Sequence, residues 1–183
     1  AGTLLMLGYT INEIKDKTNY LNSSTKKIAI KKAIFPWSRF PAEDTMLGPE
    51  MKATGEVLGI GKDFGTALNK AYAAAGVEIG DKEKGVFVTL SDAEKPNFID
   101  VVKQYVDLGF SIYATEGTGS FLKLNGIESI IVGRADDRTP TSLTIIEEKL
   151  ISIVINTPTY ANEYTDGWKI RRLSHETGVA VVS

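Results

Sequence analysis

The second half of the chain alternates short apolar runs with amphipathic stretches. The runs at residues 86–90 and 151–156 are rich in β-branched residues and have the length of buried strands. Residues 96–108 repeat apolar positions at the i, i+3, i+4 spacing of a helix. In full, this pattern predicts strands over 85–90, 110–115, 129–133, 151–156 and 179–182, and helices over 96–108, 117–125, 141–149 and 168–177. β-branched strands separated by helices predict an α/β fold with a five-stranded, mainly parallel, doubly wound sheet.

The first 80 residues have a less regular pattern. A strand is predicted over 27–35, where apolar residues alternate with lysines, and an amphipathic helix over 63–75, which ends at Gly76. The polar, glycine-flanked segment 80–85 is the predicted linker, which divides the chain into residues 1–80 and 81–183. We expect the first part to lack a complete core of its own. Because the chain starts without methionine and ends in an apolar run, we expect a fragment of a longer polypeptide.

Composition excludes several classes of function. The 183 residues contain no cysteine, so disulfides and thiolate metal sites are impossible. The single histidine, His175, leaves little material for zinc or Ser-His-Asp chemistry. A net charge of −2 provides no general attraction to nucleic acid, and no apolar run approaches the roughly 18 residues that span a membrane. We therefore expect neither nucleic acid nor membrane as a partner, whereas a cytoplasmic location and a homo-oligomer are compatible with the sequence.

Polar residues gather where the predicted strands end. Two threonines flank a glycine-rich helix start after the second strand, and cations or an amide follow the other strands. These residues are Thr89, Lys95, Thr115, Thr118, Arg134 and Asn156. Parallel sheets bind ligands at the carboxyl ends of their strands. Hydroxyls, cations and a helix N-terminus are the groups that hold phosphate, so the sequence predicts a phosphate-binding site at this edge.

Each of these residues also has an ordinary structural explanation. Thr115 or Thr118 would serve as a helix N-cap, Lys95 as a solvated surface lysine, and Asn156 as a turn residue before Pro158. Their convergence on one edge favours the ligand site. The nearby carboxylates form no recognisable general acid–base pair, which favours binding and regulation over catalysis. These carboxylates are Glu116, Asp136, Asp137 and Asp166.

Several longer strings resemble a known family. Residues 35–41 (FPWSRFP) and 47–61 (LGPEMKATGEVLGIG) resemble the end of the second synthetase half of the carbamoyl-phosphate synthetase large chain. Residues 114–118 (ATEGT), 155–157 (INT) and 170–172 (IRR) resemble the methylglyoxal-synthase-like domain that ends the same chain. The resemblance implies that residues 1–80 are the C-terminal tail of the second ATP-grasp half. It implies that residues 81–183 are the allosteric domain.

The resemblance also implies partners and cofactors. The full large chain works with a glutaminase small chain in arginine and pyrimidine biosynthesis, and it uses ATP with Mg or Mn, and potassium. The present chain is expected to hold no cofactor, to be inactive alone and to be cytoplasmic. Its allosteric domain would bind an effector, which in relatives is UMP, IMP, phosphoribosyl pyrophosphate or N-acetylglutamate.

The phosphate-binding residues carry over position by position. Thr115 and Thr118 match the paired threonines that hold the effector phosphate in the family. Lys95 matches a phosphate-contacting lysine, and Thr89 stands where relatives often carry serine. We expect Thr118→Val to weaken effector binding, with little change in stability if Thr118 is not an N-cap.

The remaining positions concern the rest of the effector. Asn156 matches an effector-contacting asparagine, and Asp166 matches an acidic position in the loop that follows. Arg134 replaces a lysine of some relatives, which changes the geometry offered to phosphate. Pro158 replaces a threonine, so one contact to a nucleoside is in doubt. Because Lys95 and Arg134 suit a doubly charged phosphate, we expect UMP first and phosphoribosyl pyrophosphate second.

Two other functions stay open at this point. One is a free-standing lyase of the methylglyoxal synthase type, acting on dihydroxyacetone phosphate. Such enzymes use a catalytic aspartate and histidine, and His175, predicted in the middle of a helix, does not clearly supply the histidine. The other is a purely structural oligomerisation module, for which the polar edge would have no ligand.

Overall fold

The computed structural model describes residues 2–17, 26–34, 55–77, 79–134, 140–157 and 166–182. Of the synthetase-like strings, residues 35–41 and 47–54 lie outside these residues, as do Asp136, Asp137 and Pro158. Among the described residues, no helix is long and apolar enough to cross a membrane.

A five-stranded sheet forms the centre of the second half, and all of its pairings are parallel. Its strand order is β5-β4-β3-β6-β7. The strands are β3 (Gly85–Leu90), β4 (Ile112–Thr115), β5 (Ile130–Val132), β6 (Ile151–Thr157) and β7 (Ala180–Val182). The predicted α/β class and the number of strands are confirmed, and the sheet is parallel throughout.

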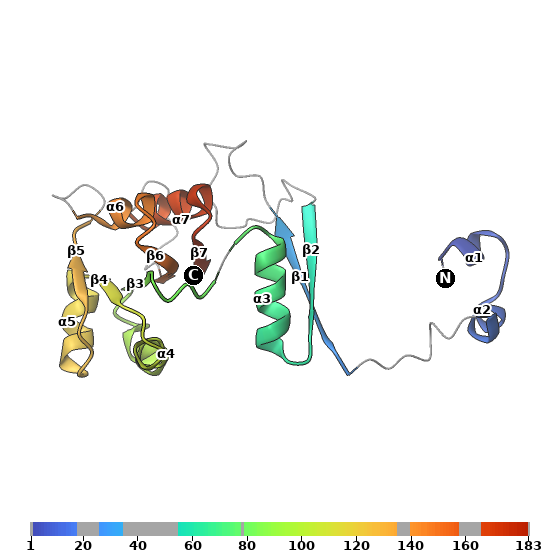
Figure 1. Ribbon diagram of the computed structural model, residues 1–183, viewed down its shortest axis with the longest axis horizontal. Helices are drawn as coiled ribbons and strands as arrows, with labels where there is room; N and C mark the ends of the chain where they lie inside the picture. The colour runs from blue at the N-terminus through green and yellow to red at the C-terminus, as the bar shows by residue number, and fades with distance from the viewer. Residues whose placement is uncertain are drawn as a thin grey trace.

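Two helices cover each face of this sheet (Figure 1). On one face lie α4 (Lys95–Asp107) and α5 (Glu116–Leu124), which pack Val102 and Leu122 against β3 and β4. On the other face lie α6 (Ser142–Glu147) and α7 (Asp166–Thr177), which pack against the opposite side chains of β3 and β6. Because both faces are covered, the two central strands are almost completely buried.

The strand order reverses between β3 and β6, which is the topological switch point of the sheet. From β3 it continues to β4 and β5, whereas from β6 it continues to β7 on the other side. The two strands pair over their length, so Thr89 lies opposite Asn156 at their carboxyl ends. Parallel sheets leave a crevice for ligands at such a reversal.

The first part of the chain contains an antiparallel pair, β1 (Ile28–Ile34) and β2 (Gly55–Gly61), with α3 (Phe64–Ala74) packed on it. The predicted strand and helix correspond to β1 and α3. Three elements were not predicted from the sequence: β2 and the short helices α1 (Gly2–Met6) and α2 (Ile11–Lys17). β2 contains three glycines, which are rare in strands and hide its pattern. The division at residues 80 and 81 stays a prediction.

Three predicted positions need correction. Helix α7 begins at Asp166, two residues before the predicted start, so Asp166 is helical and does not lie in a loop. An acidic residue in the first turn is favoured by the helix dipole, which explains the earlier start. His175 lies in the last turn of α7 and not in its middle. Lys95 is the first residue of α4, one position before the predicted start.

The close packing of α3 on β2 predicts a large effect for Gly59→Ala. A β-carbon at Gly59 would overlap the carbonyl oxygen of Ala67 and lie 2.5 Å from the amide nitrogen of Ala71. We expect a loss of about 1–3 kcal/mol in unfolding free energy, measured by urea titration. The control is Gly65→Ala in α3, where a β-carbon makes only an ordinary contact of 3.5 Å with Asp63. Equal stability of the two variants would contradict the observed packing.

Candidate functional site

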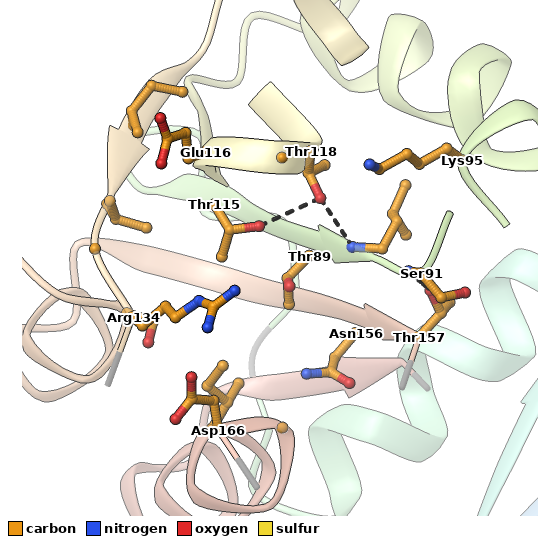
Figure 2. A pocket seen from close by; sticks show the side chains of 18 of the residues that line it. Thr89, Ser91, Lys95, Thr115, Glu116, Thr118, Arg134, Asn156, Thr157 and Asp166 are labelled. Carbon is orange, nitrogen blue, oxygen red and sulfur yellow. Dashed lines mark hydrogen bonds between the residues drawn. The ribbon is translucent and has the colours of Figure 1, made fainter. Parts of the chain in front are cut away.

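A cavity of about 650 Å³ opens at the carboxyl edge of the sheet, at the reversal between β3 and β6 (Figure 2). Its wall comes from the ends of β3, β4, β5 and β6 and from the starts of the four helices α4 to α7. All seven site residues predicted from the sequence line it. They are Thr89, Lys95, Thr115, Thr118, Arg134, Asn156 and Asp166. The structure therefore brings them together, and their role in binding stays a prediction.

Two threonines form the start of α5 beside the cavity. Thr115 is the N-cap, but its side chain makes no capping hydrogen bond. Its hydroxyl instead donates to Thr118 Oγ1 over 3.3 Å. The buried Thr118 Oγ1 also accepts a hydrogen bond of 3.1 Å from the backbone N–H of Leu90. Thr118 thus ties the end of β3 to α5, which predicts a larger contribution of its hydroxyl to stability than the sequence suggested.

Lys95 points into the cavity rather than into solvent. Its side chain is only 14% exposed, and its ammonium lies 2.6 Å from Oδ1 of Asp92, whose side chain is 94% exposed. This hydrogen bond and the charge of Lys95 lower the pKa of the Asp92 carboxyl. The ammonium also lies 3.8 Å from the position of a β-carbon on Gly117, in the first turn of α5. Lys95 is therefore not a solvated surface lysine.

The opposite wall carries an amide whose oxygen has no partner among the described residues. Asn156 belongs to β6 and is not a turn residue, and its side chain is 3% exposed. Within the described part of the chain, its Oδ1 has no hydrogen-bond partner. Gly167 lies beside this amide, since a β-carbon there would be 3.5 Å from Asn156 Nδ2 and 3.2 Å from Arg171 Nη1. The buried guanidinium of Arg171 therefore lies next to this wall.

Hydrogen bonds also join the ends of β3 and β6 at the cavity wall. The backbone N–H of Ser91 donates to the carbonyl oxygen of Thr157 at 3.1 Å and to its Oγ1 at 2.9 Å. Sequence reasoning missed several lining residues, although Thr157 directly follows the predicted Asn156. The missed residues include Ser91, Asp92, Ser142, Thr157 and Gly167.

The charges around the cavity are of both signs. Lys95 and Arg134 contribute the cations, and three carboxylates also line the wall. They are Asp92, Glu116 and Asp166. No three potential metal ligands of the His, Cys, Asp and Glu types gather among the described residues. The wall is thus built for hydrogen bonding and charge pairing.

The histidine of the chain does not line this cavity. His175 lies in the last turn of α7, at the far end of that helix from Asp166. Burial lowers the pKa of His175, and the neighbouring charges of Lys32, Arg172 and Arg171 lower it further. Lys32, whose charge acts on the imidazole, belongs to β1.

Comparison with known families identifies the second half. A family model described as the MGS-like domain matches residues 97–183. The chain contains an MGS-like domain. The match begins within α4, while the sheet of the MGS-like domain already begins with β3.

Similarity to individual proteins extends over nearly the whole chain. The carbamoyl phosphate synthase large chain, C-terminal section, of Aquifex aeolicus is 41% identical over 155 residues, which are 85% of this chain and 29% of the relative. The corresponding section from Methanocaldococcus jannaschii is 36% identical over 180 residues, 98% of this chain and 29% of the relative. The carbamoyl phosphate synthase large chain of a Synechocystis species is 37% identical over 182 residues, 99% of this chain and 16% of the relative.

These matches confirm the resemblance to the carbamoyl-phosphate synthetase large chain. The matches to the Methanocaldococcus and Synechocystis relatives cover both the MGS-like domain of this chain and the segment that precedes it. The chain spans less than a third of the length of these relatives.

The double role of the Thr118 hydroxyl predicts unequal effects for two substitutions. Thr118→Val leaves the buried N–H of Leu90 without its acceptor, so we expect unfolding free energy to fall by about 1–3 kcal/mol. Thr115→Val removes only a half-buried hydroxyl that bonds to Thr118, and we expect a smaller change. Urea titration of both variants measures the difference. A Thr118→Val protein as stable as the parent would refute the structural role of Thr118.

Proposed function

We propose that the MGS-like domain binds a phosphorylated effector in the cavity, as the regulatory C-terminal part of a carbamoyl-phosphate synthetase large chain. One observation carries the proposal: the N-terminus of α5, the hydroxyls of Thr115 and Thr118 and the ammonium of Lys95 meet on one side of the cavity. Backbone N–H groups, hydroxyls and an ammonium are complementary to the oxygens and charge of phosphate.

The hydrogen bonds of the free site leave donors for such a ligand. Thr118 Oγ1 accepts two hydrogen bonds, from Leu90 and Thr115, so its own proton is available to an acceptor in the cavity. The side chain of Thr115 leaves the first N–H groups of α5 uncapped. A phosphate oxygen placed there would accept from both sources.

The carboxylates on the wall do not prevent an anion from binding there. Asp92 is almost fully exposed, so its carboxylate is free to turn to water when a phosphate takes its place beside Lys95. Glu116 and Asp166 each stand in the first turn of a helix, where the helix dipole offsets part of their charge. Arg134 supplies a second cation for the ligand from the end of β5.

The proposal includes an order of effectors. We propose UMP first and phosphoribosyl pyrophosphate second, because two cations and a helix N-terminus match a doubly charged phosphate better than a dicarboxylate such as N-acetylglutamate. For a full-length large chain, we also propose the glutaminase small chain as partner and ATP with Mg or Mn and potassium as cofactors. Its role would be cytoplasmic, in arginine and pyrimidine biosynthesis.

Removal of the Lys95 charge is expected to weaken phosphate binding. Lys95→Met keeps most of the side-chain volume, and loss of a charged hydrogen bond costs about 1.5–3 kcal/mol, so affinity for UMP should fall about tenfold or more. Calorimetry measures the dissociation constant. Higher salt should also weaken binding to the parent protein, because partly exposed charge pairs are screened.

The matched control is Lys103→Met, which removes an exposed lysine from the same helix outside the cavity. We expect its affinity for UMP to equal that of the parent protein. If Lys95→Met binds as tightly as Lys103→Met, Lys95 does not contact the phosphate. Tight binding of N-acetylglutamate with no response to UMP or phosphoribosyl pyrophosphate would overturn the choice of effector.

The lyase alternative has its own test. Because the chain has one histidine and it lies outside the cavity wall, we expect no conversion of dihydroxyacetone phosphate to methylglyoxal by the purified protein. We also expect no carbamoyl phosphate from ATP, bicarbonate and ammonia. Colorimetric assays of both products over hours at high protein concentration measure this. Turnover that scales with protein concentration would establish an activity in place of a regulatory role.

A further inference from the structure

Ser142 lines the candidate site and carries a buried hydroxyl that finds no partner among the described residues. The residue is the first of α6, its exposed fraction is 0%, and it lines the cavity. Within the described part of the chain, Ser142 Oγ has no hydrogen-bond partner. A buried hydroxyl without a hydrogen bond costs free energy, so such groups in proteins call for an explanation.

The helix does not need this hydroxyl. The N-cap of α6 is Thr141, whose Oγ1 accepts from the N–H of Thr144 at 3.2 Å. The backbone N–H of Ser142 donates to the carbonyl oxygen of Gly133 at 3.0 Å, which fixes the start of α6 against the end of β5. Because Thr141 caps the helix and Ser142 contributes only its backbone N–H to these bonds, alanine at position 142 would serve the helix equally well.

The hydroxyl lies across the sheet edge from the phosphate-binding residues. Lys95 and Thr118 belong to α4 and α5, which cover one face, whereas Ser142 belongs to α6 on the other face. The unpaired Oδ1 of Asn156 also lies in this wall, at the end of β6. A ligand with phosphate at α5 would therefore meet Ser142 with its other part.

We propose that Ser142 determines specificity for the part of the effector that is not phosphate. Its hydroxyl forms a hydrogen bond with a hydroxyl or amide group of the ligand, so the site selects phosphate esters that carry such a group. A sugar or a base provides this chemistry. This inference rests on the proposed function, because it assigns the phosphate to the α5 side of the cavity.

The test substitutes Ser142→Ala in the full chain and measures binding of UMP, phosphoribosyl pyrophosphate, ribose 5-phosphate and inorganic phosphate by calorimetry. We expect affinity for UMP and phosphoribosyl pyrophosphate to fall about tenfold and affinity for inorganic phosphate to stay the same. If ribose 5-phosphate loses affinity equally, the contact is to the sugar, and if only UMP loses affinity, the contact is to the base. The melting temperature without ligand should be unchanged or higher.

Ser152→Ala is the matched control. Ser152 is 5% exposed, and its Oγ also has no partner in the described part of the chain. It lies at a register shift near the start of β6, by a separate cavity at the opposite edge of the sheet. We expect the same small change in melting temperature as for Ser142→Ala and unchanged affinity for every ligand.

The outcomes separate this inference from the proposed function. If the parent binds UMP or phosphoribosyl pyrophosphate and Ser142→Ala binds it equally well, the role of Ser142 is refuted while the proposed function stands. If the parent binds none of the four ligands, both are refuted. A lower melting temperature for Ser142→Ala alone, or an equal loss of inorganic phosphate binding, would show a structural or phosphate-binding hydroxyl and would also overturn the inference.

Discussion

The pairing of β3 with β6 is the constraint on which the rest of the domain depends. These two strands are buried on both faces and sit at the centre of the sheet, yet the chain leaves them in opposite directions. The helices that follow them, α4 and α7, therefore start on opposite faces and cannot close over the strand ends. The cavity is the space that this reversal leaves, and its polar wall follows from the loops and helix starts around it.

Some of the polar groups in this wall are costly in the free protein. The Oδ1 atom of Asn156 and the hydroxyl of Ser142 are buried without partners among the described residues, and Lys95 takes its counter-ion from an exposed aspartate. Such groups lower the stability of the free state and are better satisfied by a ligand. A ligand that pairs with them is bound more tightly because the protein does not satisfy them by itself. The same buried polar groups thus lower the stability of the free protein and strengthen the binding of a ligand that pairs with them.

The sequence predicted the fold of the second half because β-branched strands, helix periods and glycine stops agree there. It predicted seven cavity residues because strand ends in a parallel sheet share one edge. It could not show that Thr118 accepts from Leu90, since this bond depends on how α5 sits against β3. Ser142 was missed for a related reason: an unpaired hydroxyl is recognised only when all its neighbours are known. In β2, glycines that admit α3 removed the apolar pattern that would have revealed the strand.

Helix α7 relates the cavity to the preceding part of the chain, because its start lines the cavity and the charge of a β1 lysine acts on a histidine in its last turn. Asp166 and Gly167 at its start line the cavity, and His175 in its last turn lies near enough to Lys32 of β1 for that charge to lower its pKa. The ammonium of Lys32 in turn lies 4.8 Å from the ring centre of Tyr72 in α3, which packs against the core of the sheet. A ligand that contacts the start of α7 would therefore touch a helix whose last turn lies within electrostatic reach of Lys32 in β1.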